Sequence, residues 1–148
     1  MKRRTWIALG WTVLLVLGGC ASGPRGFRTT GGLRILAAVP DVTAGCRVRA
    51  GDWMVLTGND FGSPADWRSG ANRLRFSPGV APPRIELTRE KDPATLFFLV
   101  PQGAQSGPVR LHVEGVGDAA FTVVVEAGVA AANAVPGCAL PSAPQGNP

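Results

Sequence analysis

The chain has 148 residues and carries 15 Lys and Arg against 10 Asp and Glu, a formal net charge of +5. Three of these charges belong to Lys2, Arg3 and Arg4, which leaves the rest of the chain near +2, with its arginines spread along the sequence. This weak excess, without a zinc-finger, recognition-helix or aromatic-basic pattern, argues against nucleic-acid binding. The length suits one domain with its own core better than two.

Residues 1–19 have the three parts of a secretory signal peptide. A basic start is followed by an apolar segment from Trp6 to Leu17, and small residues then precede Cys20. A transmembrane helix needs about 20 apolar residues, and this segment has about a dozen. The leader therefore favours export over a membrane span.

The segment Leu17-Gly-Gly-Cys20 resembles the lipobox of bacterial lipoproteins. The resemblance implies that Cys20 is lipidated, becomes the new N-terminus and anchors the protein to a membrane of the cell envelope. Ala21 follows the cysteine in place of Asp, which in lipoproteins of two-membrane bacteria usually implies the outer membrane. A plain cleaved signal and a short uncleaved anchor are the alternatives.

With Cys20 lipidated, Cys46 and Cys138 remain as one candidate disulfide in an oxidising compartment. A bridge between them would close a loop of about 92 residues, which the chain-entropy model values at about 4–5 kcal/mol. The alternative is two separate thiols, one buried near the start of the domain and one loose in the tail.

Residues 20–32 are expected to form a lipidated, flexible tether, because turn-forming residues follow one another there without periodicity. Residues 127–148 are expected to form a Pro- and Ala-rich tail. Between these ends, residues 33–126 contain short apolar or alternating segments separated by Gly, Pro, Asp and Asn. These segments predict strands at Leu33–Val39, Gly51–Gly58, Asn72–Phe76, Arg84–Thr88, Thr95–Val100, Val109–Val113 and Ala120–Glu126.

About seven short strands and no amphipathic helix predict an all-β sandwich, with a small closed barrel as the main alternative. Three segments, in order, resemble the IPT/TIG group of immunoglobulin-like domains. Residues 51–62 resemble that group's early strand with its Thr-Gly-x-x-Phe-Gly corner, residues 72–76 the next strand, and residues 99–113 the Val-Pro turn and the Gly-led strand after it. The resemblance spans residues 33–126 and implies an immunoglobulin-like sandwich used for binding, spacing or assembly.

The corner of this motif has its own expected structure. Gly58 and Gly62 would adopt backbone angles that other residues resist, and Phe61 would fold inward and close one end of the sandwich. Asn59 and Asp60 would stabilise the corner by side-chain-to-backbone hydrogen bonds.

The sequence predicts neither an enzyme nor a cofactor. His112, the only histidine, falls on the wet face of a strand, and no serine or cysteine occupies a recognisable nucleophile turn. No phosphate loop or dinucleotide fingerprint is present. We also expect no metal site, because no calcium-loop spacing fits the oxygen-bearing side chains Asp52, Asn59, Asp60 and Asp66.

Trp53 and Trp67 are the candidate partner-binding residues. If Met54 and Leu56 point inward, Trp53 points outward, and Trp67 lies in a polar loop. Exposed tryptophans can form a sugar-stacking or protein-docking patch. The alternative is that one tryptophan fills the core of the second sheet and the other caps a sandwich end.

These features predict a non-catalytic, lipid-anchored envelope protein whose immunoglobulin-like domain binds a protein or glycan partner. A structural accessory lipoprotein of a secretion or surface-polymer assembly is the second hypothesis. A small hydrolase is the third, and the missing catalytic constellation argues against it. The oligomeric state has no signal in the sequence.

Overall fold

The computed structural model describes residues 26–89, 91–127 and 138–144. Cys20 and the leader that precedes it lie outside these ranges, as does most of the C-terminal tail. No helix within the described ranges is long and apolar enough to cross a membrane.

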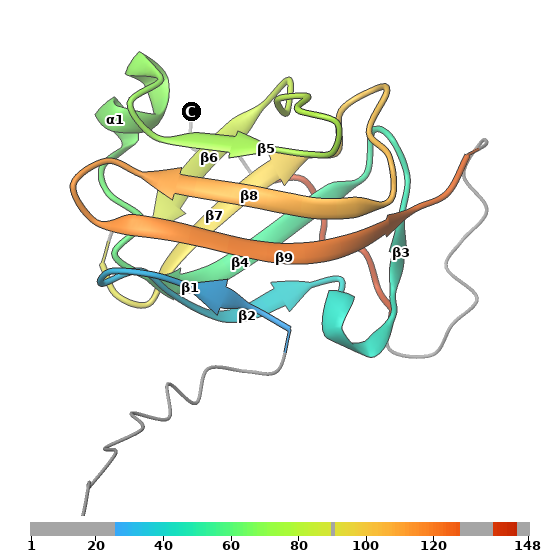
Figure 1. Ribbon diagram of the computed structural model, residues 1–148, viewed down its shortest axis with the longest axis horizontal. Coiled ribbons are helices and arrows are strands. Elements are labelled where there is room, and N and C mark those ends of the chain that lie inside the picture. The colour runs from blue at the N-terminus through green and yellow to red at the C-terminus, as the bar shows by residue number, and fades with distance from the viewer. Residues whose placement is uncertain (1–25, 90, 128–137, 145–148) are drawn as a thin grey trace, which may run out of the picture.

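The described chain folds into two layers of β-sheet (Figure 1). The strands are β1 (Arg28–Thr29), β2 (Arg34–Val39), β3 (Arg47–Val48), β4 (Trp53–Asn59), β5 (Arg73–Arg75), β6 (Ile85–Arg89), β7 (Ala94–Leu99), β8 (Gly107–Val113) and β9 (Gly117–Val125). Two short helices connect them, the 3-10 helix η1 (Val42–Ala44) and the α-helix α1 (Pro64–Ser69).

One sheet has the strand order β1-β9-β8-β5, with β3 added parallel to β9, and the other has the order β2-β4-β7-β6. In Figure 1 the first sheet faces the viewer and the second lies behind it. No strand pairing joins the two sheets in the described part of the chain, so the barrel alternative is wrong and the predicted all-β sandwich is confirmed. The sets β2-β4-β7-β6 and β5-β8-β9 have the order of the four- and three-stranded sheets of immunoglobulin-like domains.

The core lies between the two sheets and follows from alternation along the strands. On β8, Val109, Leu111 and Val113 are at most 1% exposed, while Arg110 and His112 point outward, as the sequence predicted. Strands β2, β4, β5, β7, β8 and β9 contribute buried residues to one cluster, and Ile85 and Leu87 of β6 pack against it partly buried. Its largest fully buried side chains are Phe61, Phe76, Phe98, Leu33, Ile35, Met54, Leu56, Leu74, Leu96 and Leu111.

The fold begins earlier than the sequence predicted, because part of the expected tether is a strand. Arg28 of β1 lies opposite Ala120 of β9, and Phe27 packs against Phe121 with ring centroids 5.6 Å apart. A two-residue strand among turn formers has no pattern of its own, and its partner lies about 90 residues further along the chain. The tether expected over residues 20–32 is thus too long at its C-terminal end.

A short helix occupies a segment in which the sequence predicted no helix. The Ser63 hydroxyl accepts a bond from the Asp66 N–H, while the Asp66 carboxylate accepts one from the Ser63 N–H, which makes a capping box with Pro64 in the first turn. Gly70 ends α1 in the left-handed conformation with φ +80°. Local capping forms this helix rather than an apolar 3.6-residue period.

The corner after β4 forms as expected, with one change in how its glycines act. Phe61 is 1% exposed, and Gly62 has a left-handed φ of +74°. Gly58 is needed for close approach instead, since a Cβ there would lie 2.2 Å from the Arg34 carbonyl oxygen.

The side-chain bonds that hold this corner come from Asn72 and Trp67 rather than from Asn59 or Asp60. The buried Asn72 amide donates to the Phe61 carbonyl oxygen at 3.2 Å and accepts from the Glu114 N–H at 3.0 Å. Asp60 contributes its backbone N–H, which donates to the Asp92 carboxylate at 3.2 Å. A single buried amide therefore joins the corner to the β8–β9 turn.

Candidate functional site

Trp53 lies on the outer surface of the β2-β4-β7-β6 sheet, the position expected if Met54 and Leu56 point inward, as both do. Its neighbour Met54 is fully buried on the opposite side of β4. Trp53 pairs with Leu99 of β7, and two residues along, Val55 lies between Val39 of β2 and Phe97 of β7. We call this apolar group the tryptophan face and define it as Trp53, Val39, Val55, Phe97 and Leu99.

The tryptophan face is only partly covered by its own neighbours. Val55 is 8% exposed because the flanking strands shield it, whereas Val39 at the edge of the sheet is 42% exposed. Trp53, Phe97 and Leu99 are half-buried. An outward apolar row of this kind is typical of a surface that contacts a partner.

A basic side chain shapes the surface around Trp53. The Arg84 guanidinium lies 5.5 Å from the centroid of the indole ring, within the range of a cation–π contact. Arg84 also forms an ion pair with Glu86, and Phe97 meets Trp53 edge-to-face at 6.4 Å. These contacts hold the indole in one orientation and cover one of its ring faces.

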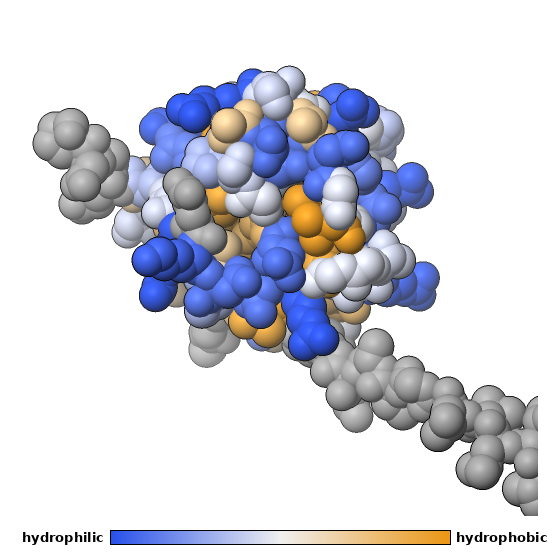
Figure 2. Space-filling view, turned by 90° about the vertical axis from the view of Figure 1, so that its left-hand side faces the viewer, coloured by the Kyte–Doolittle hydropathy of each residue, from blue (hydrophilic) through white to orange (hydrophobic). Residues whose placement is uncertain are grey.

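Trp67 has a different role, and the two tryptophans do not form one patch. Trp53 is the first residue of β4, whereas Trp67 lies in α1, which follows the other end of β4. A strand of seven residues is about 20 Å long, so the strand separates the two side chains. The Trp67 indole Nε1 donates to the Phe61 carbonyl oxygen at 2.8 Å, and its ring packs against the core. Trp67 thus caps the end of the sandwich, whose surface is mostly hydrophilic (Figure 2).

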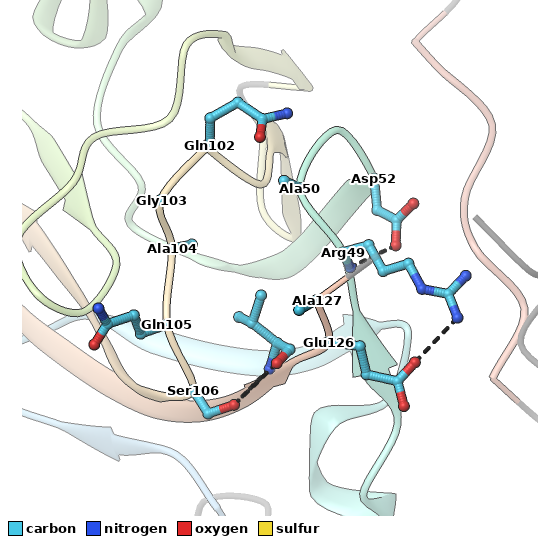
Figure 3. Close-up of a pocket in the computed structure, with 11 residues that line it drawn as sticks. Arg49, Ala50, Asp52, Gln102, Gly103, Ala104, Gln105, Ser106, Glu126 and Ala127 are labelled. Atoms are coloured by element: carbon cyan, nitrogen blue, oxygen red, sulfur yellow. Dashed lines mark hydrogen bonds and ion pairs between the residues drawn. The ribbon is translucent and has the colours of Figure 1, made fainter. Parts of the chain in front are cut away.

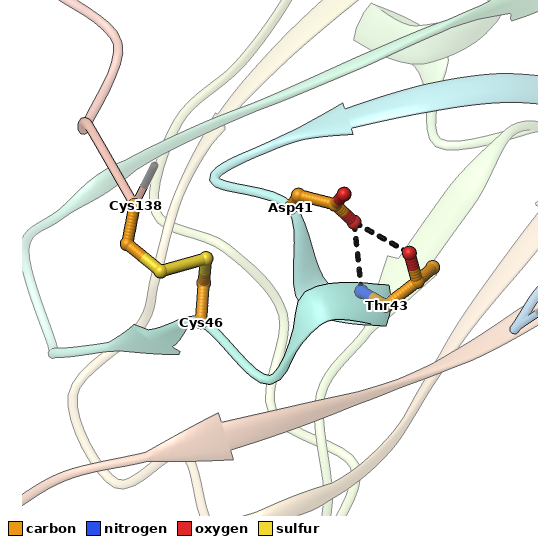
Figure 4. Close-up of a disulfide and its surroundings, with 4 residues drawn as sticks. All are labelled: Asp41, Thr43, Cys46 and Cys138. Carbon is orange, nitrogen blue, oxygen red and sulfur yellow. Dashed lines mark hydrogen bonds between the residues drawn. A yellow bond between two sulfur atoms is a disulfide. The ribbon is translucent and has the colours of Figure 1, made fainter. Parts of the chain in front are cut away.

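Cys46 and Cys138 form the predicted disulfide (Figure 4). Both are 2% exposed, and their Cα atoms are 5.4 Å apart. Next to the bridge, Asp41 caps η1 by accepting bonds from the Thr43 hydroxyl and N–H, and these bonds hold the pKa of Asp41 below its usual value. The bridge joins the C-terminal segment to the chain just before β3.

A pocket of about 810 Å³ (Figure 3) lies beside β3, at the end of the sandwich opposite α1 (Figure 1). The β3–β4 turn, the loop 102–106 and the end of β9 line it. The Ser106 hydroxyl accepts from the Val125 N–H at 2.9 Å and lies 3.2 Å from the Val125 carbonyl oxygen, so the β9 backbone engages it.

The charged groups of this pocket also bond to one another. Arg49 contacts Glu126 at 3.0 Å, and Arg47 contacts the same carboxylate at 2.6 Å. Hydrogen bonds from Arg47 and Arg49 lower the pKa of Glu126. The Asp52 carboxylate accepts from the Arg49 N–H at 2.7 Å. This arrangement stabilises β3 and the end of β9 and offers no activated nucleophile.

His112 lies on the outer face of β8 between two carboxylates. Its Nδ1 is 2.8 Å from Asp118 and its Nε2 is 3.3 Å from Glu114. The hydrogen bond to Asp118, and then the one to Glu114, raise the pKa of His112. The side chain is 44% exposed, which places it on the surface as the sequence predicted.

Four arginines gather on one surface that the sequence did not predict. Arg28, the neighbours Arg73 and Arg75, and Arg110 come from three distant segments of the chain. All four nevertheless lie on the outer face of the β1-β9-β8-β5 sheet. The alternation of Arg73 with Leu74 and of Arg110 with Leu111 in the sequence indicates that these arginines point outward from their strands. Strand register was needed to bring the pairs together.

The oxygen-bearing side chains considered for a metal do not converge. Asp52 precedes β4, whereas Asn59 is its last residue, Asp60 follows it, and Asp66 is part of the α1 cap. Among the residues that the structure describes, no group of three His, Cys, Asp or Glu could hold a metal ion. Comparison with protein-family models, curated proteins and solved structures found no match.

Proposed function

We propose that this chain is a lipid-anchored protein of the bacterial cell envelope whose immunoglobulin-like domain binds a partner without catalysis. The Leu17-Gly-Gly-Cys20 segment supports the anchor, and the domain follows it after a short tether. The strand order and the buried Phe61 corner support the IPT/TIG resemblance. Fold alone identifies no ligand.

The tryptophan face carries the proposal that the domain binds a partner. It is an outward apolar row on a four-stranded sheet, held rigid by Arg84 and Phe97 around Trp53. Rigid aromatic groups beside an arginine are enriched among residues that dominate protein–protein binding. The second candidate residue, Trp67, is absorbed in the end cap and contributes to folding instead.

Between a protein and a glycan, the contacts favour a protein partner. A sugar stacks on an open face of an aromatic ring, and the Arg84 guanidinium already covers one face of Trp53. Phe97 approaches the same indole from its edge. What remains is a partly exposed apolar surface with an Arg84–Glu86 ion pair beside it, which suits the apolar centre and polar rim of a protein interface.

Site-specific photo-crosslinking in intact cells tests this proposal. A photoreactive residue at Val39 samples the tryptophan face, and one at Val124, which is similarly exposed on the other sheet, is the control. We expect a discrete crosslinked envelope protein from Val39 only, and its loss in the variant Trp53→Ala. Equal crosslinking from both sites, or crosslinking that survives Trp53→Ala, would contradict the proposal.

A further inference from the structure

Strand register builds a basic row across the outer face of the β1-β9-β8-β5 sheet. Arg75 lies opposite Arg110, Arg110 opposite Ala120, and Ala120 opposite Arg28. Arg73 is two residues from Arg75 and therefore points to the same side. We call the group Arg28, Arg73, Arg75 and Arg110 the basic face.

The charges of the basic face are uncompensated. None of its four arginines forms an ion pair with a carboxylate within the described ranges, although three other arginines do so elsewhere in the fold. The carboxylate of Asp118 on this surface is engaged by His112 at 2.8 Å. Arg75 and Arg110 lie directly opposite each other, and like charges in that arrangement destabilise a sheet. An anionic partner would relieve that repulsion.

The basic face surrounds a shallow hollow of about 630 Å³. The small side chain of Ala120 lies between Arg110 and Arg28, which leaves room between the two guanidinium groups. Arginine recognises phosphate groups through its planar fork of donors. The hollow and the open sheet around it fit phosphate groups spread over a surface.

The position of the anchor indicates which surface that is. Arg28 is eight residues after Cys20, so the chain between them spans at most about 29 Å. A compact domain of this size has a radius of gyration of about 13 Å, which corresponds to a sphere about 34 Å across, so the tether is shorter than the domain is wide. β1, where the fold begins, is itself part of the basic sheet. The bilayer that holds the lipid is the nearest phosphate-bearing surface.

We infer that the basic face docks onto anionic phospholipid headgroups of the membrane that carries the anchor. This inference rests on the proposed lipid anchor and assigns the domain an orientation. The tryptophan face belongs to the outer surface of the other sheet, so docking leaves it pointing away from the bilayer. A basic residue near an anionic bilayer strengthens binding about fivefold, so removing two arginines lowers the ratio of docked to undocked protein about 25-fold.

Fluorescence quenching on vesicles tests the orientation. The full-length protein, purified from membranes, is reconstituted into phosphatidylglycerol or phosphatidylcholine vesicles that contain a headgroup quencher. A fluorophore is attached through Thr122→Cys, which lies on the basic side, or through Ala37→Cys, which lies on the other sheet. We expect strong quenching only for the Thr122 probe on phosphatidylglycerol, and its loss in high salt, which shortens electrostatic range to about 3 Å at 1 M.

A matched pair of variants gives the decisive comparison. Arg75→Gln with Arg110→Gln should abolish the quenching, whereas Arg34→Gln with Arg89→Gln, which removes two exposed arginines from the other sheet, should preserve it. Equal quenching of both probes overturns the inference, and so does the absence of quenching on phosphatidylglycerol. The absence of quenching is also the result expected if the basic face binds an acidic protein rather than lipid. Vesicle flotation distinguishes failure of the basic face to dock from failure of the lipid anchor, because an anchored protein floats with vesicles of either lipid.

Discussion

The indole N–H of Trp67 donates a 2.8 Å hydrogen bond to the carbonyl oxygen of Phe61, six residues earlier in the chain. The same oxygen accepts the amide of Asn72 at 3.2 Å. One backbone carbonyl thus joins the buried corner, helix α1 and the start of β5. This arrangement distinguishes the two tryptophans, because Trp67 supports the fold while Trp53 forms part of an outer surface.

Trp67→Ala should therefore destabilise the protein more than Trp53→Ala. Loss of the packed ring and its hydrogen bond should cost about 2–4 kcal/mol, while loss of the Trp53 contacts with Phe97 and Arg84 should cost about 1 kcal/mol. Urea unfolding measures the free energy of unfolding of both variants. The loss for Trp67→Phe, which keeps an aromatic ring but lacks the hydrogen-bond donor, should fall between the losses for Trp53→Ala and Trp67→Ala. A larger loss for Trp53→Ala than for Trp67→Ala would contradict the assignment.

The Cys46–Cys138 disulfide should contribute a large part of the stability. The cysteines are 92 residues apart, and the chain-entropy model gives about 4–5 kcal/mol for a loop of that length. Unfolding of Cys46→Ser with Cys138→Ser, compared with the unaltered chain, measures this contribution. Intact mass with and without reductant is the control, and a mass unchanged by reduction would show that the bridge is absent.

Asn72→Ala should weaken the fold, because it removes a buried amide that bonds both the Phe61 carbonyl oxygen and the Glu114 N–H. Loss of these two hydrogen bonds should cost about 1–3 kcal/mol. Asn59→Ala is the matched control and should change stability by less than about 0.5 kcal/mol, since it changes a partly exposed surface position. The same loss for both variants would argue against the role assigned to Asn72.

His112 should make stability depend on pH above the usual histidine pKa of 6.5. Its pKa is raised in the folded protein by Asp118 and Glu114, so its contribution is full below the unfolded value and is lost as pH rises through the folded value. Unfolding of His112→Gln and the unaltered chain at several pH values should show their difference shrinking over that window. A difference that grows with pH would contradict this sign.

The strands were predictable where local alternation determines the buried face. Val109 to Val113 alternates between apolar and polar residues, the segment around Met54 is an apolar run bounded by glycines, and both form central strands. β1 and α1 were not predictable in the same way. β1 depends on pairing with Ala119 and Ala120 at the far end of the chain, and α1 depends on the reciprocal bonds of Ser63 and Asp66.

The surfaces were harder to predict than the core. The outward direction of Trp53 follows from the burial of Met54, but its neighbours Val39 and Phe97 come from other strands. The basic face likewise exists only because register aligns Arg75 with Arg110. Cross-strand register is not written in any single segment, so arginines that looked scattered along the sequence form one surface.

The proposed function depends on a lipid at Cys20 that holds this domain on a membrane of the envelope. Mass spectrometry of the N-terminal peptide, from protein purified out of native membranes, tests for this lipid. We expect a chain that begins at Cys20 and carries the added mass of acyl chains. A chain that begins at another residue, or at an unmodified Cys20, would contradict the proposal.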